Sequence, residues 1–184
     1  MPVVHRLRAL RSGTSPARAL ELFDELPPVT ADDLLGTWAG RGIPTGHPLD
    51  GLLERYGWYG KRFGSSEDVD PLLFRAPRGR LVGLTPALLP VRPVLRMAPA
   101  ARGPVGVAAF SLLRPLLTTG TPQARLRTVR YRGTVSAALV YDRFPAIDAF
   151  RGVDRDTVLG VMDLRWSPAP YVFVLRRAGG VTPR

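Results

Sequence analysis

Hydrophobic residues recur at two spacings along this chain, and the two spacings separate a helical start from an extended remainder. Behind Ser15-Pro16, apolar side chains recur every three or four residues up to Leu26, with charged residues between them. A serine N-cap, a proline in the first turn and a 3.6-residue period predict a helix. Pro27-Pro28 ends that helix, because proline lacks the backbone N–H that would continue it.

After residue 35 the apolar positions alternate or form short runs bounded by glycine and proline, which is typical of strands. Short helices are expected at 48–56 and 145–150, and the proline-rich segment 84–104 is expected to be irregular or to lie at a sheet edge. The predicted strands are 36–43, 58–63, 72–75 paired with 80–83, the apolar run 105–113, 124–132 paired with 134–141, 158–166, and 171–177.

The connections between these strands are short, and no β–α–β spacing occurs. Eight to ten antiparallel strands with a few short helices are most economically arranged as a closed or nearly closed β-barrel, because closure removes the sheet edges. A barrel of that size is either packed solid or holds one small ligand. We expect a loose basic N-terminus over 1–14, a single mainly β domain over 15–178, and a tail over 179–184.

Composition excludes several kinds of site. There is no cysteine and there are two histidines, so disulfides, thiolate metal sites and His-rich metal sites are not expected, and no metal is predicted. Lys61 is the one lysine among 26 basic residues, an arginine bias typical of GC-rich bacterial genomes. No signal peptide or membrane span is evident in the sequence, so a cytoplasmic location is expected.

The net charge of +11 originates in one segment. Residues 71–141 contain 11 arginines and no aspartate or glutamate, whereas the flanking parts are nearly balanced. Such a segment attracts anions, but stacking aromatics are sparse in it, so nucleic-acid binding is not predicted. Whether the segment forms one basic face is left open.

Candidate ligand-binding residues in the first half are Trp38, His47, Trp58 and Lys61. A tryptophan on a glycine-rich strand is usually a core residue, and His47 between Gly46 and Pro48 suits a turn. His47 is nevertheless one of two side chains that titrate near neutrality. Lys61 stands out in a chain that otherwise uses arginine, which suggests a buried ammonium or an amine nucleophile.

The second half contributes Tyr141 and Asp163 as candidate ligand-binding residues, and Asp142 as a further candidate only for catalysis. Asp163 interrupts an apolar strand, where an unpaired buried carboxylate is costly. It either pairs with a nearby arginine or acts as a pocket carboxylate with a shifted pKa. If the protein is an enzyme, the candidate catalytic residues are His47, Lys61, Tyr141, Asp142 and Asp163.

The run Gly36-Thr37-Trp38-Ala39-Gly40, followed by Gly57-Trp58-Tyr59-Gly60-Lys61, resembles the bacterial GXWXG protein family. Segments from Ala124 to Asp163 resemble the domain of unknown function usually fused to it. The expected extents are about 18–78 and 120–177. The resemblance implies a calycin- or lipocalin-like barrel whose first-strand tryptophan closes the floor. Nitrobindin-like relatives hold haem through a late histidine, and no histidine follows His47, so haem is disfavoured and no cofactor is expected.

Three functions remain open. The first is binding of a hydrophobic or amphipathic small molecule, such as a fatty acid, isoprenoid or polyketide, with an arginine of the acid-free segment receiving a carboxylate. The second is a cyclase or isomerase of specialised metabolism acting on a lipophilic substrate in the same barrel. The third is a packed barrel that binds a partner protein; a homodimer is also compatible with the sequence.

Overall fold

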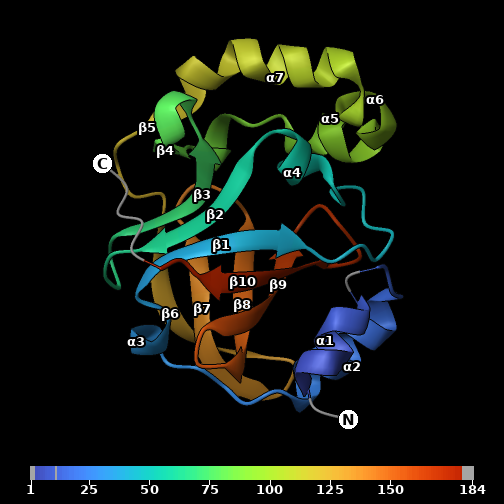
Figure 1. The fold of residues 1–184 in the computed structure, drawn as a ribbon, viewed down its shortest axis with the longest axis vertical. Coiled ribbons are helices and arrows are strands. Elements are labelled where there is room, and N and C mark those ends of the chain that lie inside the picture. The colour runs from blue at the N-terminus through green and yellow to red at the C-terminus, as the bar shows by residue number, and fades with distance from the viewer. Residues whose placement is uncertain (1–2, 11, 180–184) are drawn as a thin grey trace.

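An antiparallel β-barrel of eight strands forms the centre of the protein (Figure 1). The computed structural model describes residues 3–10 and 12–179. The barrel order is β2-β1-β10-β9-β8-β7-β6-β3, and pairing of β2 with β3 closes it. The barrel strands are β1 (Gly36–Gly42), β2 (Trp58–Phe63), β3 (Val69–Arg75), β6 (Ala124–Tyr131), β7 (Thr134–Tyr141), β8 (Ala146–Asp154), β9 (Thr157–Leu164) and β10 (Tyr171–Arg177).

Two short strands and several helices lie outside the closed barrel. The strands β4 (Leu81–Leu84) and β5 (Thr118–Thr119) extend the sheet from β3. The helices are α1 (Val3–Leu10), α2 (Pro16–Glu25), α3 (Ala31–Leu34), α4 (Leu52–Arg55), α5 (Val91–Arg96), α6 (Ala98–Arg102) and α7 (Pro104–Leu117), with single 3-10 turns η1 (Pro77–Gly79) and η2 (Pro86–Leu88).

Side chains alternate between two apolar layers along the barrel strands, as the two-residue period of a strand requires. One set, including Phe63, Phe150 and Phe173, fills the barrel interior. The other set belongs to β8, β9 and β10 and packs beneath α1 and α2, where Leu7 and Phe23 are buried. Strands β8–β10 are therefore apolar on both faces.

A helical cap covers one end of the barrel. It consists of η2, α5, α6 and α7, which lie together at the top of Figure 1. Two arginines fasten the cap to the barrel rim: Arg102 donates to the carbonyl of Pro48, and Arg114 donates to the carbonyl of Arg75. The cap is the part of the fold that positions the cavity described below.

Most predicted elements are present, including the helix behind Ser15 and the hairpin of β6 and β7. Four local predictions were wrong. Residues 105–113 form a helix, because a short apolar run has no period that separates a strand from a helix. Residues 145–150 belong to β8 instead of a helix, because their alternate side chains face the interior and the outer layer.

The other two errors concern segments expected to lack regular structure. The stretch 84–104 contains η2, α5 and α6, in which prolines occupy first turns or sites where the missing N–H is tolerated. Residues 3–10 form α1, held by burial of Leu7 against the outer apolar layer. Most of the predicted tail, residues 180–184, lies outside the described residues.

Candidate functional site

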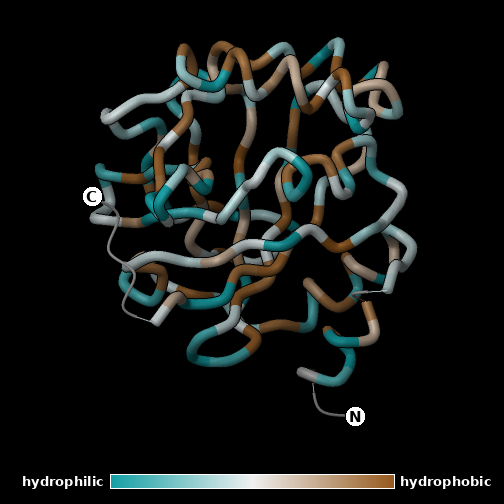
Figure 2. The backbone as a smooth tube through the Cα atoms, turned by 45° about the horizontal axis from the view of Figure 1, so that its top comes forward, coloured by the Kyte–Doolittle hydropathy of each residue, from teal (hydrophilic) through white to brown (hydrophobic). Residues whose placement is uncertain are grey.

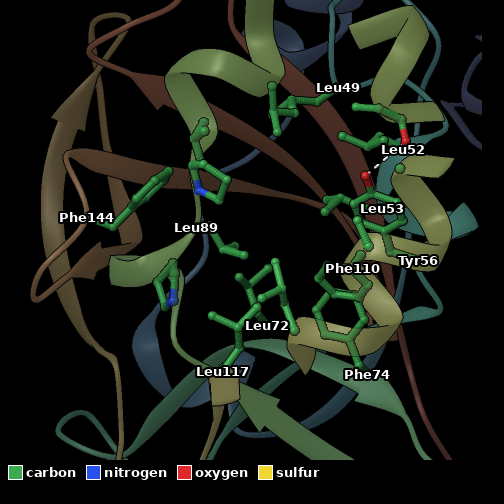
Figure 3. Close-up of a pocket in the computed structure, with 18 of the residues that line it drawn as sticks. Leu49, Leu52, Leu53, Tyr56, Leu72, Phe74, Leu89, Phe110, Leu117 and Phe144 are labelled. Atoms are coloured by element: carbon green, nitrogen blue, oxygen red, sulfur yellow. Dashed lines mark hydrogen bonds between the residues drawn. The ribbon is translucent and has the colours of Figure 1, made fainter. Parts of the chain in front are cut away.

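An apolar cavity of about 270 Å³ lies between the cap and the barrel (Figure 3). Leucines of the α4 region, Leu72 and Phe74 of β3, and Phe110 of α7 contribute to its wall. Tyr141 and Met162 line it from the barrel strands. No side chain that lines the cavity in the described structure is charged, and hydroxyl groups enter its lining only with two tyrosines, Tyr56 and Tyr141.

Tyr56 belongs to the wall on the cap side and helps to hold the cap in place. Its hydroxyl donates to the carbonyl oxygen of Ala101 at 2.9 Å, and its ring stacks on Phe110 with centroids 4.3 Å apart. This hydroxyl is therefore already occupied by a contact between α6 and the α4 region. Tyr141 is the residue that connects the cavity to the chemistry inside the barrel.

A buried ion pair lies behind Tyr141. Lys61 Nζ is 2.8 Å from Asp148 Oδ2, and both side chains are almost fully excluded from solvent. The Tyr141 hydroxyl donates to the same carboxylate oxygen at 3.1 Å. Lys61 also donates to the carbonyl of Pro71 at 3.0 Å. Three strands thus bring one ammonium, one carboxylate and one phenol together.

Burial dominates the proton affinities in this cluster. Loss of solvent raises the pKa of Asp148 above its usual value, although Lys61 and Tyr141 act in the opposite direction. The pKa of Tyr141 is raised well above that of a free phenol, first by burial and then by the Asp148 charge. Tyr141 is therefore a neutral hydrogen-bonding group at neutral pH.

Aromatic rings surround the ammonium group. Lys61 Nζ lies 5.1 Å from the centroid of Phe173 and 5.9 Å from that of Trp58. Rings within about 6 Å attract a cation through their negative faces. Four buried polar atoms on the described barrel strands have no hydrogen-bond partner: Arg151 Nε, Asp148 Oδ1, Trp58 Nε1 and the Tyr171 hydroxyl. Buried polar atoms without partners are uncommon and mark places where a polar ligand group or water binds.

The glycines of the sequence motif make room for these rings. A Cβ atom on Gly40 would lie 2.3 Å from the Trp58 ring, and one on Gly42 would lie 2.4 Å from the Tyr171 hydroxyl oxygen. Both distances are far below van der Waals contact. The spacing Gly-x-Trp-x-Gly-x-Gly therefore removes side chains from β1 where β2 and β10 place large aromatic residues.

Trp38 occupies a separate part of the interior, next to α3. Its Nε1 donates to the Leu34 carbonyl at 2.6 Å, and the Arg177 guanidinium lies 4.3 Å from the ring centroid. The residue is fully buried and does not contact the cavity. That Trp38 closes the barrel floor stays a prediction from the family resemblance.

His47 is held in a turn by both ring nitrogens. Nδ1 accepts the Leu49 N–H at 3.1 Å, and Nε2 lies 2.9 Å from Ser167 Oγ, which donates to the Ala169 carbonyl. Burial lowers the pKa of His47, which keeps the ring neutral. His47 lies outside the cavity wall and fastens the turn to the loop between β9 and β10.

The two carboxylates proposed near the chain's end are on the outside. Asp142 pairs with Arg125 at 2.7 Å on the surface. Asp163 is exposed, and no ion pair is found for it among the described residues. Neither residue approaches the cavity.

Asp148 is the site residue that the sequence analysis missed. It shares a face with Ala146 and Phe150 in the alternation of β8, and this signal was hidden because 145–150 was predicted to be helical. Among the described residues, no group of histidine, aspartate and glutamate side chains is arranged to hold a metal ion.

Comparisons with known proteins support the fold and the family. No curated protein matches the sequence. A solved structure, described as the crystal structure of a protein from Thermomonospora curvata, is similar with a TM-score of 0.71 and 35% sequence identity. The match covers 97% of this chain and 99% of that one.

Two family models match separate parts of the barrel. The GXWXG protein model matches residues 21–79, which contain Trp38, Lys61 and the motif glycines. The model of a domain of unknown function, DUF4334, matches residues 122–177, which contain Tyr141 and Asp148. The cap lies between the two matched regions. With its motif, its second domain and its barrel, this chain belongs to the GXWXG protein family with a C-terminal DUF4334 domain.

Proposed function

We propose that this protein binds a neutral lipophilic small molecule in the cavity between the cap and the barrel. The observation that carries the proposal is the cavity's wall, which is apolar except for two tyrosines and contains no charged side chain. Ligand cavities are typically concave and apolar, with a few polar groups that fix orientation. Tyr141 supplies such a group, backed by Asp148 and Lys61.

The absence of charge from the described wall narrows the ligand class. A carboxylate in this cavity has no unpaired cation to meet, since Lys61 is already paired with Asp148. Burying an unpaired charge is far more costly than burying a hydroxyl or carbonyl group. This argument favours an isoprenoid alcohol or a neutral polyketide over a fatty acid.

The cavity's size favours a compact ligand. Its volume of about 270 Å³ is just below the range of about 300–1,000 Å³ that is typical of ligand cavities. A short branched chain fills such a volume better than a long acyl chain does. The existence of the cavity also favours a ligand-binding barrel over a packed barrel that only binds partner proteins.

The first test is native mass spectrometry of the purified protein with solvent extraction of any bound molecule. The second is a thermal-shift comparison of geraniol with geranate, which share a short branched chain and differ in charge. We expect the alcohol to raise the melting temperature and the acid to have little effect.

A Leu53→Trp variant, which fills the cavity from its half-buried edge, should abolish the shift, whereas Val135→Trp on the outer surface should preserve it. Equal shifts for both ligands would refute the neutral-ligand argument.

One observation favours a second candidate, an isomerase or cyclase acting on the same ligand. A buried ammonium–carboxylate pair is rarely worth its desolvation cost as a stabilising contact, so its presence next to a cavity suggests a functional role. Tyr141 would contact the substrate and exchange a proton with the Asp148 carboxylate. Tyr141→Phe separates the two candidates: a binding protein keeps its affinity within a few fold, whereas an enzyme loses about 10²–10⁴ in turnover.

A further inference from the structure

The longest helix of the protein is apolar on all sides although it lies at the surface. Apart from Ser111 and Arg114, the 14 residues of α7 are apolar, glycine or proline. Helices that are hydrophobic all round are normally buried. The inner side of α7, with Phe110, Leu113 and Leu117, lines the cavity, which accounts for the apolar residues on that side.

The outer side of α7 is largely exposed to solvent in the described chain. Val105 is 82% exposed, Leu112 is 80% exposed and Leu116 is 76% exposed. Their spacing of seven and four residues places them in one stripe along the helix. Leu88 and Met97, elsewhere in the cap, are also more than half exposed. Figure 2 shows hydrophobic positions recurring along this outer segment.

The surroundings of this stripe are basic. Residues 71–120, which include the cap and the β3–β4 hairpin beside it, contain seven arginines and no acidic residue. Arg78, Arg80 and Arg96 are exposed, and none of them has an acidic partner within the described structure. By contrast, the arginines of the β6–β7 hairpin, such as Arg125 and Arg132, pair with aspartates. Other exposed arginines, such as Arg18, Arg41 and Arg143, also have no ion pair among the described residues, but acidic residues occur in the segments that contain them, whereas residues 71–120 carry positive charge alone.

We propose that the outer face of the cap docks on an anionic lipid bilayer. An exposed apolar stripe in an arginine-containing segment without acidic residues suits the membrane interface, where apolar side chains lie among the acyl chains and cations lie near the headgroups. A protein partner would need a complementary acidic rim, whereas a bilayer provides the apolar layer and the anionic surface together. None of the described helices is long and apolar enough to cross a membrane, so the docking is peripheral.

The docking surface lies directly over the cavity. The outer side of α7 carries Leu112 and Leu116, and the inner side of the same helix carries Phe110 of the cavity wall. A bilayer in contact with the two leucines is therefore about one helix diameter from the cavity. A lipophilic molecule dissolved in the bilayer then reaches the cavity by displacement of the cap, without crossing water. The docking proposal depends only on the exposed apolar stripe and the arginines of the cap segment, and it does not require the proposed ligand.

Co-sedimentation with vesicles tests the proposal. We expect the protein to pellet with phosphatidylcholine vesicles containing phosphatidylglycerol, to bind phosphatidylcholine alone weakly, and to be released by salt. Leu112→Ser with Leu116→Ser should weaken binding about tenfold or more, since two apolar anchors leave the acyl layer. Arg78→Gln with Arg80→Gln should weaken it about fivefold per arginine.

Val135→Ser is the matched control, because Val135 is exposed but lies at the far end of β7 from the cavity residue Tyr141. It should bind vesicles like the unmodified protein. Absence of pelleting with anionic vesicles, or pelleting that the leucine variant leaves unchanged, would overturn the proposal. So would a dimer in analytical ultracentrifugation that the leucine variant dissociates without any vesicle binding. The geraniol thermal shift, measured without vesicles, should be retained by the leucine variant, so a failure of docking and a failure of ligand binding are distinguishable.

Discussion

Replacing Lys61 by methionine tests whether the buried ion pair shapes this protein's stability. The change keeps the length of the side chain but leaves the Asp148 carboxylate buried without its cation. Removing one partner of a buried pair typically costs about 3–5 kcal/mol, because the remaining charge is uncompensated. We expect a loss of that size in the free energy of unfolding at pH 7, measured by urea denaturation followed through tryptophan fluorescence.

The pH dependence of that loss has a definite sign. Burial already raises the pKa of Asp148 above its unfolded value, and removal of the ammonium raises it further. A group with a raised folded pKa loses stability as the pH rises from the unfolded to the folded value. The Lys61→Met protein should therefore be much closer to the unmodified protein at pH 4.5 than at pH 7.

Two further variants separate charge from packing. Arg62→Met changes the next residue, whose pairs with Asp68 and Asp70 lie on the partly exposed outer face, and it should cost only about 1 kcal/mol. The double variant Lys61→Met with Asp148→Leu removes both charges and should recover most of the stability. Equal losses for Lys61→Met and Arg62→Met, or a loss for Lys61→Met that does not change with pH, would refute the reasoning.

Three other predictions concern the motif and its neighbours. Gly40→Ala should destabilise the protein by about 1–3 kcal/mol through its clash with Trp58, while Gly120→Ala, with open space around it, should be neutral; melting temperatures check both. The pKa of His47 is lowered in the folded state, so stability should fall as the pH drops below about 6.5, and His47→Gln should abolish that fall in urea titrations between pH 5 and 7.5. Trp38→Phe should cost about 1–3 kcal/mol in urea denaturation, because the Leu34 carbonyl loses its buried donor.

The sequence was sufficient to predict the barrel because alternation and turns specify strands locally. Glycine-punctuated alternation identified β1, β2 and the β6–β7 hairpin, and short connections implied antiparallel pairing. Closure through β2 and β3 involves no local signal, since it depends on the accumulated twist of all eight strands. The helical cap was not predicted for a different reason: its apolar residues face both the cavity and the surface, so α7 has no amphipathic period.

The candidate site was only partly predictable for a related reason. Lys61 and Tyr141 were identified by composition and by position at a strand end, and the structure brings them within 3.4 Å of each other. Asp163 was chosen because it interrupts an apolar strand, but β9 is apolar on both faces only where helices cover its outside. Asp148 has the same surroundings in sequence and points inward. The face on which a carboxylate lies in a two-sided apolar strand depends on register, which the sequence alone does not fix.

The two regions matched by the family models meet at the buried cluster of Lys61, Tyr141 and Asp148. The GXWXG region supplies the ammonium of Lys61 and the glycines that admit Trp58, whereas the DUF4334 region supplies Tyr141 and Asp148. Neither half can bury its own charge, because an isolated ammonium or carboxylate inside an apolar barrel is strongly disfavoured. Closure of the barrel therefore pairs the Lys61 ammonium of the first region with the Asp148 carboxylate of the second. The segment between the two regions forms the cap over the cavity.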